Sequence, residues 1–112
     1  MGEYKDLLRE IGKSLEKFSK LNPKQMRAFH SLMEHVEGEG VLDKKIKELI
    51  SIACGIVAHC KRCIAFHVDA ALKAGASKEE ILEAAWVAVL MGGGPALMYT
   101  QCVLEALEDF QK

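Results

Sequence analysis

Apolar residues recur at three- and four-residue steps along most of the chain, the spacing of amphipathic helices. The first such stripe comprises Tyr4, Leu7, Leu8, Ile11, Leu15, Phe18 and Leu21. Asn22 and Pro23 then form a cap followed by proline at the first helical position, which predicts a second helix, KQMRAFHSLMEHV, ending at residues 38–40. No segment shows the alternation of a half-buried strand, so the pattern predicts an all-α fold.

The second half of the chain continues the helical pattern. Asp43 is suited to cap a third helix that starts at Lys44 and becomes apolar on all sides from Leu49 onward. The segment HCKRCIAFHVDAALKAG is helical in pattern and stops at Gly75, although one unbroken helix over residues 44–74 fits equally. Ser77 and Glu80 form a capping box for a further helix. Residues 92–95, GGGP, interrupt the pattern before a last helix over residues 96–110, which makes about six helices.

Length and composition favour one soluble domain over residues 1–112. The net charge of −1 offers no basic excess for nucleic acid. The N-terminal segment is charged and amphipathic, unlike a signal peptide, and the longest apolar runs, residues 49–58 and 84–91, are shorter than the roughly 20 residues of a membrane span. We therefore expect a cytoplasmic protein without a membrane partner. Helices that lack a polar face need more cover than so small a chain supplies, which favours a homo-oligomer over a monomeric bundle.

The stretch HCKRCIAFH carries the candidate chemistry. On a helix, Cys60 and Cys63 have Cα atoms about 5 Å apart, which lies within the range of a disulfide. His67 follows Cys63 by four residues, so the three side chains project from one face. An imidazole beside a thiol can take its proton and leave the nucleophilic thiolate. The other two cysteines, Cys54 and Cys102, have apolar neighbours and are expected to be buried.

Three interpretations of these residues remain open. The first is a redox dithiol. The second is a zinc site formed by Cys60, Cys63 and His67, although a structural zinc site usually has four ligands in two separated pairs and His59 faces another side of the helix. The third is packing of two cysteines in an apolar helix, which the exposed character of Lys61 and Arg62 disfavours.

The chain also resembles a known family. The text KELISIACGIVAHCKRCIAFHVDAALKAGASKEEILEA is similar to the AhpD-like branch of the carboxymuconolactone decarboxylase family, whose pattern is ELI-type text, C-x-x-C-x-x-x-H, and A-x-x-x-G-A-[ST]-x-x-E-[IL]. The resemblance spans about residues 25–107. It implies an all-helical, AhpD-like fold that assembles as a homotrimer or homohexamer, with the C-x-x-C pair near a helix start in a subunit cleft.

The resemblance also implies a mechanism. Glu48, twelve residues before Cys60, matches the acidic member of a proton relay, and His67 matches its histidine. The implied activity is a thiol-dependent peroxidase or disulfide oxidoreductase. Its substrate is a hydroperoxide, its reductant a lipoyl or thioredoxin-like dithiol, and it needs no metal or organic cofactor. Because Cys63 is closer to His67 than Cys60 is, we expect Cys63 to be the attacking thiol and Cys60 the resolving one, with the reverse assignment open.

The chain departs from AhpD in two respects. AhpD is longer and duplicated, and it carries a histidine between the cysteines where Arg62 stands here. Without the resemblance, Glu48 would be read as an exposed partner of Lys44. The alternatives to a peroxidase are a carboxymuconolactone-decarboxylase-type enzyme without redox turnover, and a non-enzymatic redox-sensing or zinc-binding helical oligomer.

A few further residues have polar or aromatic side chains of interest. His30 and His35 are expected to be surface histidines, and His35 at a helix C-terminus suits the helix dipole. Trp86 and Tyr99 are expected in the core or at a subunit interface. The GGGP stretch is expected to be a tight turn between helices.

Overall fold

The computed structural model describes residues 2–111, and over that range it contains helices and no strand. The five helices are α1 (Glu3–Leu21), α2 (Pro23–Glu37), α3 (Lys44–Val57), α4 (Lys61–Lys73) and α5 (Lys78–Phe110). The predicted all-α fold is confirmed. The predicted sixth helix is the second arm of α5, which follows the first arm directly after a kink at Gly93.

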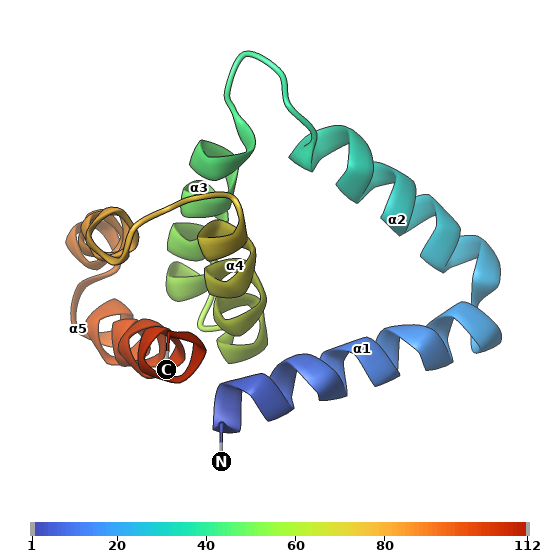
Figure 1. Cartoon of the computed structure of the whole chain (residues 1–112), viewed down its shortest axis with the longest axis horizontal. Coiled ribbons are helices and arrows are strands. Elements are labelled where there is room, and N and C mark those ends of the chain that lie inside the picture. The colour runs from blue at the N-terminus through green and yellow to red at the C-terminus, as the bar shows by residue number, and fades with distance from the viewer. Residues whose placement is uncertain (1, 112) are drawn as a thin grey trace.

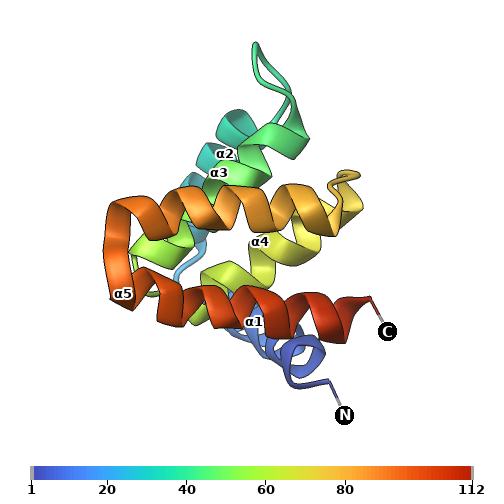
Figure 2. The same cartoon turned by 90° about the vertical axis from the view of Figure 1, so that its left-hand side faces the viewer.

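The bend in α5 lies within the predicted GGGP interruption. Gly93 has φ 70° and ψ −152°, a backbone conformation that side chains with a Cβ rarely adopt. Pro95 follows at the start of the second arm, where its missing N–H costs little. The two arms fold back on each other, as Figure 2 shows. By length and composition α5 could cross a membrane. The bend divides it into arms that are each shorter than the roughly 20 residues of a span.

Helices α3, α4 and α5 enclose the hydrophobic core (Figure 1). Its fully buried aliphatic side chains come from all three helices and include Ile52, Ile56, Ile64, Val68, Ile81 and Val103. Alanines on α4 and α5, such as Ala65 and Ala85, are also fully buried and let the backbones approach closely. One face of α3 and one face of the first arm of α5 lie in this core, whereas their other faces leave apolar residues such as Ile50, Val87 and Leu90 exposed.

Two of the three predicted helix caps form side-chain hydrogen bonds, whereas Asn22 precedes α2 without one. Asp43 accepts a hydrogen bond from the backbone N–H of Ile46 at 2.9 Å and begins α3. Ser77 and Glu80 form the capping box of α5. The Glu80 carboxylate also receives a hydrogen bond from Lys45 at 2.9 Å, which ties the start of α5 to α3. These contacts, the backbone bond at Ser77 foremost, lower the pKa of Glu80.

Helices α1 and α2 form an arm that leaves the core after its first turns (Figure 1). Only Tyr4 of the α1 stripe is buried, whereas Leu15, Phe18 and Leu21 are exposed, and α2 contains no buried residue. The periodicity therefore predicted the helix correctly, but only its N-terminal half packs on the core of this chain. The Cα radius of gyration is 14.3 Å, against about 13 Å expected for a compact domain of this length.

Candidate functional site

The junction between α3 and α4 presents the two cysteines. Helix α3 ends at Val57, and His59 has a positive φ of 58° that turns the chain. Cys60 then caps α4, which begins at Lys61. Of the two predictions left open for this region, the helix start is therefore correct and the unbroken helix over residues 44–74 is wrong.

Cys60 and Cys63 are joined by a disulfide across the first turn of α4, with Cα atoms 5.2 Å apart. The backbone N–H of Cys63 donates to Cys60 Sγ at 3.2 Å, so the sulfur of Cys60 takes the role of an N-cap acceptor. An N-cap position at a helix N-terminus stabilises a thiolate. Cys63 is exposed and Cys60 is half-buried. The pair therefore offers one exposed cysteine and one whose sulfur is well placed to hold negative charge.

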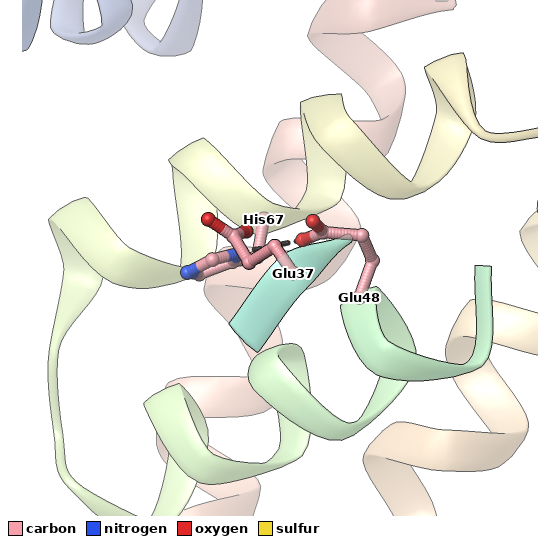
Figure 3. A group of neighbouring side chains, drawn as sticks. All are labelled: Glu37, Glu48 and His67. Carbon is pink, nitrogen blue, oxygen red and sulfur yellow. Dashed lines mark hydrogen bonds and ion pairs between the residues drawn. The ribbon is translucent and has the colours of Figure 1, made fainter. Parts of the chain in front are cut away.

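Glu48 and His67 meet where α3 and α4 pack together, one helical turn after Cys63, and Figure 3 shows their side chains pointing toward each other. Glu48 lies on α3 and is completely buried, and His67 lies on α4 with its side chain 20% exposed. His67 Nδ1 is 2.6 Å from Glu48 Oε1. Since a carboxylate can only accept, Nδ1–H donates, which leaves Nε2 with a free lone pair in the neutral ring. The sequence expectation that Glu48 approaches His67 agrees with this geometry.

The other oxygen of Glu48 lacks a hydrogen bond. Glu48 Oε2 is buried and has no hydrogen-bond partner among residues 2–111. Lys44 Nζ lies 3.9 Å from it, beyond hydrogen-bond distance but close enough for charge attraction. Lys44 is thus a neighbour of Glu48, as helix spacing alone suggests. Burial of Glu48 rules out the exposed surface pair that this spacing would otherwise indicate.

Glu37, the last residue of α2, is a third member of this cluster that sequence reasoning missed. Its carboxyl group, that of Glu48 and the His67 ring offer atoms within 4.8 Å of one another (Figure 3). Burial, and then the adjacent Glu48, raise the pKa of Glu37 above its usual range. The sequence offers one signal for this position, because Glu37 directly precedes the glycine-rich turn that leads into α3.

The donor types in this cluster also occur in cation sites, but the groups here already interact with one another. His67 Nδ1 and Glu48 Oε1 are already bonded to each other, and the Lys44 ammonium group attracts Oε2. A cation would have to displace the His67–Glu48 hydrogen bond and would lie close to the positive charge of Lys44. The cluster is therefore better described as a set of groups that hold protons. The predicted zinc donors Cys60 and Cys63 are bonded to each other, and a disulfide provides no thiolate ligand.

The expectation that Cys54 and Cys102 are buried is wrong. Cys54 is exposed on α3, and Cys102 is only half-buried. The face of α3 that carries Cys54 is not covered by another helix of the same chain. Trp86 is 58% exposed and so lies outside the core of the chain.

The remaining candidate aromatic and histidine residues make local contacts. The His59 ring stacks on Tyr99 with centroids 4.8 Å apart. His30 pairs with Glu34 at 3.3 Å, and His35 Nδ1 lies 2.7 Å from the carbonyl oxygen of Ser31. Both α2 histidines are surface residues, as expected. A hollow of about 580 Å³ lies in the corner between α1 and α2, lined by residues of those helices and by no cysteine.

Comparison with known proteins agrees with this architecture. Residues 23–106 match the model of the carboxymuconolactone decarboxylase family. The crystal structure of apo-lpg0406, a member of that family from Legionella pneumophila, has 42% identity and a TM-score of 0.96, with 100% of both chains covered. A Thermotoga maritima member, for which a role in the antioxidative response has been suggested, has 29% identity and a TM-score of 0.85, with 95% of this chain and 90% of that chain covered. An uncharacterised protein of Cupriavidus necator is 32% identical over 102 residues, 91% of this chain and 90% of the relative.

Proposed function

The chain belongs to the carboxymuconolactone decarboxylase family, and from that premise we propose that it is an AhpD-like, thiol-dependent peroxidase or disulfide oxidoreductase. The observation that carries the proposal is the hydrogen bond between the buried Glu48 Oε1 and His67 Nδ1, where His67 lies one turn after a C-x-x-C disulfide on the same helix. A buried carboxylate fixes the imidazole tautomer and its orientation. The free Nε2 is then available to move a proton to and from the thiols.

In the oxidative half of the reaction, Cys63 is the attacking thiol because it is the exposed cysteine of the pair and lies one turn before His67 on α4. His67 Nε2 accepts the Cys63 proton, directly or through water. The thiolate attacks the O–O bond of a hydroperoxide, forms a sulfenic acid and releases the alcohol after protonation of its oxygen. The Cys60 thiolate then displaces water from the sulfenic sulfur, and the disulfide forms. Two thiols and one hydroperoxide thus give one disulfide, one alcohol and one water.

The reductive half is an exchange with an external dithiol. A thiolate of the donor, a lipoyl group or a thioredoxin-like protein, attacks the accessible sulfur of Cys63. Cys60 leaves as a thiolate, which the Cys63 N–H at the start of α4 stabilises. The second thiol of the donor then displaces Cys63, whose sulfur takes its proton from His67. This reaction requires no metal or organic cofactor. A cytoplasmic location fits a dithiol that must be reduced again after each cycle.

A homo-oligomer, a trimer or hexamer, is part of the proposal. The supporting observation is the exposed apolar surface of the arm and of α5, which a soluble protein of this size rarely leaves uncovered. Its most exposed large apolar residues include Leu21, Leu32, Val36, Leu90 and Met91. Packing of such surfaces against other copies would enclose the α3–α4 junction in a subunit cleft.

The direct test is single-turnover consumption of cumene hydroperoxide or hydrogen peroxide by the reduced protein. We expect Cys60→Ser and Cys63→Ser to lose disulfide-forming turnover while they keep their helical circular dichroism. Cys54→Ser, which alters an exposed cysteine outside the pair, is the matched control and should turn over normally. Equal rates in all three variants would refute the scheme. Oxidation by peroxide without turnover by any lipoyl or thioredoxin donor would instead indicate a redox sensor.

A further inference from the structure

Glu37 occupies a position that calls for a chemical explanation. It brings a second carboxyl group to a buried carboxylate, and two like charges at such a distance repel each other. The end of α2 is nevertheless fixed there. Lys47 of α3 donates hydrogen bonds to the carbonyl oxygens of Val36 and Gly38, at 2.8 and 2.5 Å, on either side of Glu37. The arrangement is therefore anchored, and it does not result from a free helix end.

Glu48 Oε2 supplies the second half of the argument. This oxygen is buried without a hydrogen-bond donor, a condition that is costly for an ionised carboxylate. The Lys44 ammonium group at 3.9 Å does not meet the need. A protonated Glu37 would supply the missing donor from the adjacent helix. One proton would remove the repulsion between the carboxylates and satisfy the buried oxygen at the same time.

We propose that Glu37 is a positioning residue of the thiol relay, and that it shares one proton with Glu48 Oε2 so that the two carboxyl groups carry a single negative charge. This inference rests on the proposed function for its role in catalysis, but the shared proton itself does not depend on peroxide chemistry. The groups that face Glu37 are Glu48, Lys44 and Lys47 from α3 and His67 from α4. The pKa of Glu37 is raised, as expected for a carboxyl group that keeps its proton.

The charge balance explains what the shared proton does. With Glu37 protonated, one carboxylate charge on Glu48 is matched by Lys44, and the His67 ring is free to receive a proton from Cys63. The imidazolium and the Cys63 thiolate then form a neutral pair. The Glu37 proton remains on the carboxyl pair throughout and holds Glu48 in the orientation that bonds His67 Nδ1.

The first experiment is a carboxyl NMR titration of the reduced protein with labelled glutamate. We expect Glu37 to titrate above the ordinary glutamate range, and its midpoint to fall towards that range in Glu48→Gln, which removes the charged neighbour. Glu34→Gln, one turn earlier on α2, is the control variant and should leave the Glu37 midpoint unchanged. A Glu37 midpoint in the ordinary range, or one that Glu48→Gln does not move, would overturn the shared proton whether or not the protein reduces peroxides.

The second experiment compares the rate at which iodoacetamide alkylates the reduced thiols at neutral pH. Glu37→Gln keeps a neutral donor for Glu48 Oε2 and should stay within about twofold of the wild type, whereas Glu37→Ala should be slower by about tenfold, the equivalent of one lost hydrogen bond to a charged group. Glu34→Gln should match the wild type. A Gln variant as slow as the Ala variant, or an Ala variant at the wild-type rate, would contradict the positioning role. If the purified wild type retained stoichiometric zinc and the Glu37 variants lost it, the cluster would hold a cation and the shared proton would be wrong.

Discussion

His67 Nδ1 lies 2.6 Å from Glu48 Oε1, although the two residues are nineteen positions apart in the chain and lie on different helices. The carboxylate is fully buried and the imidazole is at the edge of solvent. The hydrogen bond at Nδ1 fixes the orientation of the His67 ring and leaves Nε2 free to act as a base. It is the feature on which the proposed thiol chemistry depends.

Removal of the Glu48 charge should slow the thiols. Glu48→Gln keeps the size of the side chain but presents an amide that can turn either end to His67, so the ring loses its fixed tautomer. We expect the second-order rate of thiol alkylation to fall by about tenfold or more, the free-energy equivalent of a lost charge-assisted hydrogen bond. Lys44→Met, on the same face of α3, is the control and should change the rate by less. Equal effects of the two variants would mean that the general charge of the cluster matters and the Glu48–His67 bond does not.

Trapped mixed disulfides identify which of the two cysteines reacts first with an external thiol or disulfide. In Cys60→Ser, a donor thiol that bonds to Cys63 cannot be displaced, so a mixed disulfide on Cys63 should accumulate. In Cys63→Ser, less mixed disulfide should form at the same donor concentration, because Cys60 is half-buried. Intact-mass spectrometry after incubation with oxidised glutathione measures both. Greater trapping on Cys60 would exchange the two roles.

The raised pKa of Glu37 predicts a pH dependence of stability. The folded state holds the Glu37 proton more tightly than the unfolded state, whose ordinary pKa is 4.5, so the stabilisation is fully present below 4.5. It is lost as pH rises through the higher pKa of the folded state. The free energy of unfolding of the wild type should therefore fall relative to that of Glu37→Gln over this window. Urea unfolding at a series of pH values and constant protein concentration measures the difference. A constant difference between the two proteins would contradict the shift.

The bend in α5 should depend on one glycine. Gly93→Ala meets no steric neighbour within 4 Å, so its cost comes from the backbone conformation alone, about 1–3 kcal/mol. Gly94→Ala also meets nothing within 4 Å but has no positive φ, so it should be neutral or slightly stabilising. Thermal or urea unfolding of the two variants makes the comparison. Similar stabilities would show that the bend can relax to another conformation.

The exposed apolar surface of α5 predicts a change in assembly. Leu90 is 81% exposed, and Leu90→Arg places a charge where an interface between copies is proposed. We expect the mass measured by light scattering to fall from a multiple of 12.4 kDa towards the single-chain value. Glu83→Arg, an exposed position on the same arm, is the control. A wild type that is already monomeric would remove the oligomer from the proposal.

Local rules predicted much of this molecule correctly. Periodicity and caps located the helices, and the Cys60–Cys63 spacing placed two sulfurs on one turn, because both properties depend on residues within a few positions of each other. The approach of Glu48 to His67 was expected only from the family resemblance, since no helix spacing relates residues on different helices.

Tertiary packing decided the rest. Burial of Glu48, exposure of Cys54 and the extended arm depend on which helix faces which, and a hydrophobic pattern marks an apolar face without naming its partner. Glu37 is the clearest case. Ten residues, including the turn between α2 and α3, separate it from Glu48 in the sequence, and the Lys47 hydrogen bonds at the end of α2 help to hold its carboxyl group near the buried one. The sequence by itself determined the helices and the redox pair, because these are local; the surroundings of the pair were determined by contacts between distant segments.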